Sequence, residues 1–132
     1  MIFLLLKVAG LEYVPEHILN DWALEPSRLW QVGDVSPATG QPHEDAGFNI
    51  TMPNHEAWPD ALAYLADFLD TKTEMFHELI SLGANCELHV GVSVDGDDTV
   101  AQPLEFPRGF MADLLEREID LSVLAFPAED KS

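Results

Sequence analysis

The chain has 132 residues, of which 47% are hydrophobic, and this length and composition are typical of one folded domain rather than of a disordered segment. It carries 24 acidic and 6 basic residues, and its formal net charge of -18 is spread along the sequence. A negative field of this size repels phosphate backbones and anionic lipid, and the dispersed cations form no basic patch. We therefore expect neither nucleic acid nor a membrane surface as a partner.

The first half of the sequence predicts three strands and one short helix. Residues 2–8 form an almost unbroken apolar run, which is typical of a central strand buried on both faces. The run has no basic region before it and no cleavage site after it, so we interpret it as a strand and not as a signal peptide. Pro15 begins a short helix, and residues 29–32 form a second strand. Residues 48–52 alternate apolar and polar side chains and form a third strand.

The second half predicts two or three helices and further strands. Apolar residues at helical spacing between Trp58 and Leu82 indicate two helices, or one helix bent near Thr71. Thr73 is the expected cap of the second helix, and Gly83 is its expected stop.

Residues 86–94 then alternate strictly between apolar and polar side chains, which predicts a strand with one buried face. A turn at residues 95–96 leads into a short strand at 99–101. A last helix follows Pro107, and residues 119–126 form a closing strand.

These elements predict an α+β fold for residues 1–127, followed by a frayed tail at 128–132. We expect a mixed, largely antiparallel sheet of about five or six strands with helices on one face, arranged loosely like a ferredoxin-type unit with additions. No run of about 18 uncharged apolar residues is present, so no spanning helix is expected. The single cysteine, Cys86, cannot form an internal disulfide and fits a reducing compartment, which predicts a cytoplasmic protein.

Residues 24–34 read Leu-Glu-Pro-Ser-Arg-Leu-Trp-Gln-Val-Gly-Asp. This segment resembles the Leu-x-Pro-[Ser/Thr]-x-x-x-x-x-Gly-[Asp/Glu] signature of the bacterial family called domain of unknown function 4279. The order of strands and helices is similar to that family over most of the chain. The resemblance implies a fold, but no activity, because the family has no established one.

The same segment contains candidate binding residues. Arg28 and Trp30 can form a ledge on the surface; alternatively, Trp30 belongs to the core and Arg28 pairs with a carboxylate. Gly33 can adopt a backbone conformation that other residues avoid, and Asp34 can cap the turn by accepting hydrogen bonds from backbone amides.

Histidines and carboxylates supply the other candidates. Residues 33–47 contain turn residues among polar ones, which predicts a surface excursion. Within it, His43, Glu44 and Asp45 are candidate ligands of a small molecule or a metal. Such a site requires convergence with His55 or His89, because no local metal-binding spacing is present. His89 is also a candidate by itself, unless a helix covers its face of the strand.

We find no arrangement typical of catalysis and no cofactor motif, so we predict that the protein is not an enzyme. The leading hypothesis is an acidic binding protein that recognises a basic protein partner, and an immunity-type inhibitor is its sharpest form. Two alternatives stay open. One is a small-molecule or metal-binding domain with its site near residues 33–47, and the other is an accessory homodimer that pairs through an edge strand such as 99–101.

Overall fold

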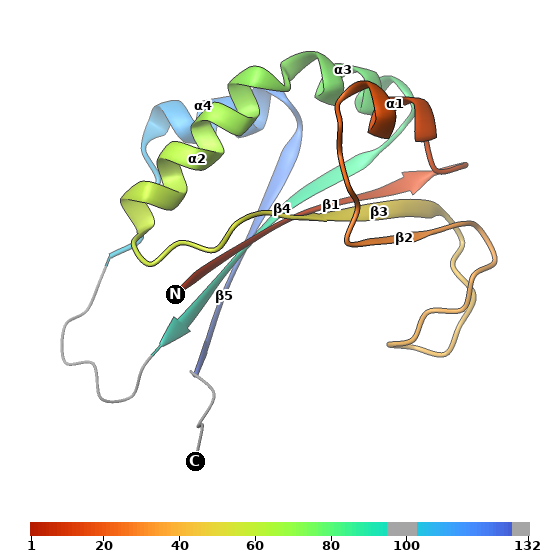
Figure 1. The fold of residues 1–132 in the computed structure, drawn as a ribbon, viewed down its shortest axis with the longest axis horizontal. Helices are drawn as coiled ribbons and strands as arrows, with labels where there is room; N and C mark the ends of the chain where they lie inside the picture. The colour runs from red at the N-terminus through yellow and green to blue at the C-terminus, as the bar shows by residue number, and fades with distance from the viewer. Residues whose placement is uncertain (95–102, 128–132) are drawn as a thin grey trace.

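The computed structural model describes residues 1–94 and 103–127 and places strand β1 (Ile2–Leu11) at the centre of a five-stranded sheet. Every second side chain from Ile2 to Val8 is buried, whereas Phe3 and Lys7 on the opposite face are exposed. The predicted central position of this strand is confirmed. The prediction that both of its faces are buried is wrong, because the helices pack on one side of the sheet only (Figure 1).

The strands follow the order β2-β3-β1-β4-β5 across the sheet (Figure 1). Each strand is antiparallel to the next from β2 (Arg28–Trp30) through β3 (Ala46–Thr51) and β1 to β4 (Asn85–Val94), and β5 (Ile119–Pro127) runs parallel to β4. The first four strands and the helices between them have the β-α-β-β-α-β connectivity of a ferredoxin-like unit, to which β5 is added at one edge. The predicted fold class is confirmed.

Four helices of the described chain lie on one face of the sheet, as predicted (Figure 1). They are α1 (Glu16–Asp21), α2 (Trp58–Thr71), α3 (Thr73–Ser81) and α4 (Arg108–Glu116). Helix α4 belongs to the crossover that joins the parallel strands β4 and β5, because a tight hairpin cannot connect parallel neighbours. The predicted strand at 99–101 and the predicted tail at 128–132 lie outside the described residues.

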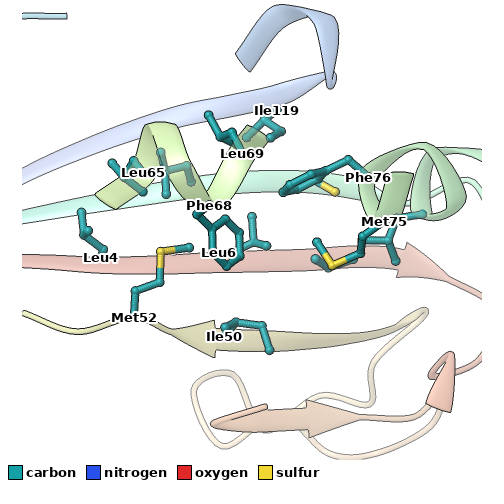
Figure 2. Packing of buried hydrophobic residues seen from close by; sticks show 14 of the residues in the cluster. Leu4, Leu6, Ile50, Met52, Leu65, Phe68, Leu69, Met75, Phe76 and Ile119 are labelled. Atoms are coloured by element: carbon teal, nitrogen blue, oxygen red, sulfur yellow. The ribbon is translucent and has the colours of Figure 1, made fainter. Parts of the chain in front are cut away.

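The hydrophobic core fills the space between the helices and the covered face of the sheet (Figure 2). Leu65 and Phe68 of α2 and Phe76 of α3 pack over Leu4 and Leu6 of β1, and all five side chains are buried. Burying one such side chain stabilises a fold by about 1.5–3 kcal/mol. This single layer of contacts is therefore the main source of stability.

The chain turns out of the helical conformation at Lys72, so α2 and α3 are two helices rather than one. The prediction that Thr73 caps α3 is wrong, since no side-chain cap is formed there. Its hydroxyl instead donates to the carbonyl oxygens of Leu69 and Asp70, each at 3.1 Å. Threonine commonly bonds to the preceding turn of a helix in this way. Gly83 has a φ of 85° and follows the end of α3, as predicted for a helix stop.

Arg117 connects the junction of α2 and α3 to the end of α4. It is only 7% exposed. Its Nε donates to the Leu69 carbonyl oxygen at 3.1 Å, its Nη1 to the Asp113 carbonyl oxygen at 2.9 Å, and its Nη2 to the Thr73 hydroxyl at 2.8 Å. Carboxylate oxygens of Asp113 and Glu116 lie 3.7 and 3.9 Å from Nη1. One buried cation thus satisfies carbonyl groups at the ends of two different helices.

We expect Arg117→Met to lower the free energy of unfolding by about 3 kcal/mol, because the carbonyl groups of Leu69 and Asp113 lose charged donors while the packing volume is largely kept. Urea unfolding followed by circular dichroism measures the change. Arg108→Met is the matched control, since Arg108 is exposed at the start of α4. The control should change the stability by less than about 0.5 kcal/mol. Equal effects of the two substitutions would contradict the role assigned to Arg117.

Candidate functional site

The excursion between β2 and β3 is a hairpin held by its own backbone. The Gly33 amide donates to the His43 carbonyl oxygen at 2.9 Å, and the His43 amide donates to the Asp34 carbonyl oxygen at 2.8 Å. The Ser36 amide donates to the Gln41 carbonyl oxygen, also at 2.8 Å. Gly33 has a φ of 93°, which is unfavourable for residues with a side chain. The structure therefore brings the predicted residues Gly33, Asp34 and His43 together, with Gly33 and its neighbours shaping the backbone.

The acidic residues at the two ends of this hairpin have structural contacts. Asp34 Oδ2 accepts a hydrogen bond from the Gln31 amide at 2.8 Å, which confirms that Asp34 caps the turn. Asp45 Oδ2 accepts a hydrogen bond from the Gly10 amide at 2.9 Å and so ties the hairpin to the end of β1. Glu44 between them is exposed. Two of these carboxylates are therefore used to hold the backbone.

Trp30 is buried on the face of the sheet opposite the helices. It is only 5% exposed, although it lies outside the main hydrophobic core. A Cβ atom at Gly47 would collide with the indole ring and with the Val8 carbonyl oxygen, so only glycine leaves room for the ring. The imidazole of His43 stacks on the indole with ring centroids 5.2 Å apart. Trp30 is thus enclosed between β3 and the returning arm of the hairpin.

Several polar groups around Trp30 have no partner among the described residues. Trp30 Nε1, His43 Nε2 and Asn49 Oδ1 are buried without a hydrogen bond. The Arg28 guanidinium lies over the indole, 5.6 Å from the ring centroid. In the sheet register, Asn49 of β3 lies between Arg28 of β2 and Lys7 of β1. Neither Arg28 nor Lys7 forms an ion pair within the described chain. We call these residues, Lys7, Arg28, Trp30, His43 and Asn49, the Trp30 cluster.

The predicted candidate His89 lies elsewhere on the same open face. It projects from β4, where no helix covers it, and its Nε2 is 3.2 Å from Glu87 Oε1 but has no hydrogen-bond partner within the described chain. His55 lies beside Tyr64 of α2, with ring centroids 5.4 Å apart. In the described ranges, no three histidine, cysteine or acidic side chains form a group that could hold a metal ion. His43 and Glu44 therefore do not converge with His55 or His89 in the way a metal site requires.

The helices carry an acidic outer surface. On helices α2, α3 and α4 its exposed carboxylates are Asp60, Asp67, Asp70, Glu74, Glu78 and Glu116. Among the described residues, the only cationic groups within 4 Å of any helix carboxylate are His77, beside Glu74, and the buried Arg117. We call this region the acidic helical surface. Lys72 at the junction of α2 and α3 and the exposed Arg108 are the other cations of this region, so carboxylates outnumber cations on it.

A shallow pocket of about 340 Å³ opens at the start of β5. Its lining residues are Ile80, Ala84, Asn85, Leu115, Glu118, Ile119 and Asp120. Glu118 has a φ of 53°, a left-handed conformation at the end of α4 that usually favours glycine. Sequence reasoning missed this Glu118 pocket, because its two sides meet only through the parallel register that pairs Cys86 with Ile119.

Comparisons of the chain with protein-family models, with curated proteins and with solved structures found no match. The resemblance of residues 24–34 to the family called domain of unknown function 4279 stays a prediction. None of the helices in residues 1–94 and 103–127 has the length and apolar character needed to cross a membrane.

The Cys86 thiol is buried on the helix-covered face of β4, as expected for a packing residue. Burial raises its pKa from the ordinary value of 9.0 to about 12. The neutral thiol is therefore the stable form at physiological pH. Since the thiolate is the reactive form, Cys86 is not positioned to act as a nucleophile.

We expect the native chain to resist labelling by Ellman's reagent at about pH 8 and to react fully in urea. The control is an exposed cysteine, Glu56→Cys in a Cys86→Ala chain, which should react quickly without urea. If the native chain reacted at the rate of this control, Cys86 would not be buried.

The raised pKa of Cys86 also predicts a pH dependence of stability. Between the ordinary pKa of 9.0 and about 12 the unfolded chain loses the thiol proton while the folded chain keeps it, so stability falls as pH rises through this window.

Proposed function

We propose that this chain is a non-enzymatic binding protein whose acidic helical surface meets a basic protein partner. The observation that carries the proposal is that exposed carboxylates outnumber the cations Lys72, Arg108 and Arg117 on helices α2 to α4 and their ends, and that few of these carboxylates have a cationic group within 4 Å in the described chain. Lys7 and Arg28 lie on the opposite, open face of the sheet and do not neutralise this surface. Charge of one sign on one side of a domain attracts partners of the other sign.

The sharpest form of the proposal is an immunity-type inhibitor that covers a basic toxin. A toxin that acts on nucleic acid presents a basic site to its substrate. An acidic inhibitor approaches such a site quickly, because complementary charges steer diffusional encounter and strengthen the discrimination against wrong partners. Association of this kind weakens as salt screens the charges.

Affinity capture from the source cell at low and at high salt tests the proposal. We expect a basic protein to be retained at low salt and released at high salt, and mass spectrometry identifies it. A chain with Asp67→Asn, Asp70→Asn, Glu74→Gln and Glu78→Gln should lose most of this retention, because these changes neutralise the acidic helical surface.

The matched control neutralises the same number of charges outside the helices. It carries Glu12→Gln, Glu25→Gln, Glu44→Gln and Glu56→Gln, all at exposed positions. The control should retain the partner nearly as well as the unmodified chain. If both variants lose the partner equally, net charge alone explains the binding. If neither loses it, the acidic helical surface is not the binding surface.

A second function, binding of a small anionic molecule, is favoured by the Trp30 cluster. Arg28 and Lys7 have no carboxylate partner in the described chain although 24 acidic residues are present in the sequence. The exposed Arg28 guanidinium is a charged donor that lies over the Trp30 indole, so an anionic oxygen is the group that satisfies it. This alternative needs no metal and no catalytic group.

Titration with acetate, followed by the indole N–H signal of Trp30 in a nitrogen-15 NMR spectrum, tests the second function. We expect a saturable shift with acetate, little shift with the neutral analogue acetamide, and loss of the shift in Arg28→Gln. The indole signals of Trp22 and Trp58 serve as internal controls. An equal response to acetamide, or an unchanged response in Arg28→Gln, would contradict anion binding at this cluster.

A further inference from the structure

Strand β5 is an edge of the sheet in the described part of the chain. Its nine residues pair with β4 in an uninterrupted parallel register. On the helix side of β5 Leu121 is 37% and Val123 46% exposed, and on the open side Leu124 is 65% exposed. The outer row of backbone N–H and C=O groups on an edge strand can pair with a further strand. Apolar side chains on both faces flank that row here.

Within the part of the chain that the structure describes, strand β5 lacks the features by which proteins usually protect an edge. It contains one charged residue, Asp120, near its beginning, and it has no lysine and no register shift against β4. Its only proline, Pro127, is its last residue. The opposite edge, β2, has three residues and leads directly into the hairpin of residues 31–45. Of the two edges, β5 is the one long enough to accept another strand.

The Glu118 pocket determines what kind of strand fits. Glu118 and Asp120 are exposed, and neither has a cationic partner within 4 Å among the described residues. Leu115 and Ile80 supply apolar surface in the same pocket. An arginine or lysine side chain matches this lining, because its aliphatic stem packs on apolar groups while its charged end reaches carboxylates.

We propose that an extended basic segment of the partner adds to β5 as a further strand and places an arginine or lysine side chain in the Glu118 pocket. Main-chain hydrogen bonds to β5 provide affinity, and the pocket provides specificity. Apolar side chains of the added strand extend the row formed by Leu121 and Val123. The inference rests on the proposed function, because it takes the partner to be basic. It adds strand pairing at β5 as the contact that keeps the partner bound after charge has brought it close.

Synthetic peptides test this inference without the partner itself. Each peptide has the nine-residue length of β5 and alternates valine with threonine, with one arginine at either the N-terminal or the C-terminal end. We expect one of the two to bind and to slow amide hydrogen exchange at alternate residues of β5. The end that carries the arginine in the binding peptide then gives the direction of the added strand. The same peptide with N-methylated backbone amides should not bind, because it cannot complete the main-chain hydrogen bonds.

Variants of the chain test the pocket. Glu118→Gln combined with Asp120→Asn should weaken binding of the arginine peptide by about tenfold and reduce its salt dependence. The control is Glu12→Gln combined with Glu25→Gln, which removes the same charge from exposed positions outside the helices and outside the Glu118 pocket. Binding to this control should stay within about twofold of the unmodified chain. A peptide with glutamine in place of arginine should bind both variants and the unmodified chain about equally.

Three results would overturn the inference. The first is no binding of either arginine peptide at about 1 mM, a concentration that reveals weak complexes. The second is binding that leaves the β5 amides unprotected. The third is protection of β5 amides without peptide that increases with protein concentration, since a second copy of the chain then occupies the edge. None of these results depends on capture of a cellular partner, so the capture experiment with the neutralised helical surface still tests the proposed function separately.

Discussion

Helices α2 and α3 bury one face of the sheet, and the position of every surface described above depends on this contact. Their apolar side chains cover Leu4 and Leu6 of β1, so the alternate residues of each strand face away from the core (Figure 2). The helices thereby present their own outer side, with its carboxylates, to solvent. Lys7, Arg28 and His89 lie on the uncovered face of the sheet, and β5 forms one of its edges.

The sequence predicted those elements whose side-chain pattern repeats over many residues. The strict alternation at 86–94 became β4, and the helical spacing after Trp58 became α2 and α3. The prediction for the apolar run at 2–8 was wrong on one point, because an apolar composition does not distinguish a strand covered on two faces from one that leaves Phe3 exposed. The predicted cap at Thr73 was also wrong, since its hydroxyl had carbonyl groups of the preceding helix within reach.

The candidate site was predicted only where its residues are close in sequence. Gly33, Asp34 and His43 belong to one hairpin, and turn chemistry alone places them together. The position of Trp30 depends on the absence of a side chain at Gly47, and the Glu118 pocket depends on the parallel register between β4 and β5. Both are tertiary relationships between segments far apart in sequence. Local propensity does not determine which strands become neighbours.

The net negative charge of the chain bears on which strands can pair with the edge of β5. A long apolar edge strand promotes pairing between identical chains, and natural proteins prevent this with charge or with covering segments. Two copies of a chain with a formal charge of -18 repel each other, so the charge opposes self-pairing although β5 itself carries little of it. The same field attracts a basic strand. In the proposed complex, an acidic surface of this kind therefore favours a segment of opposite charge over a second copy as the occupant of this edge.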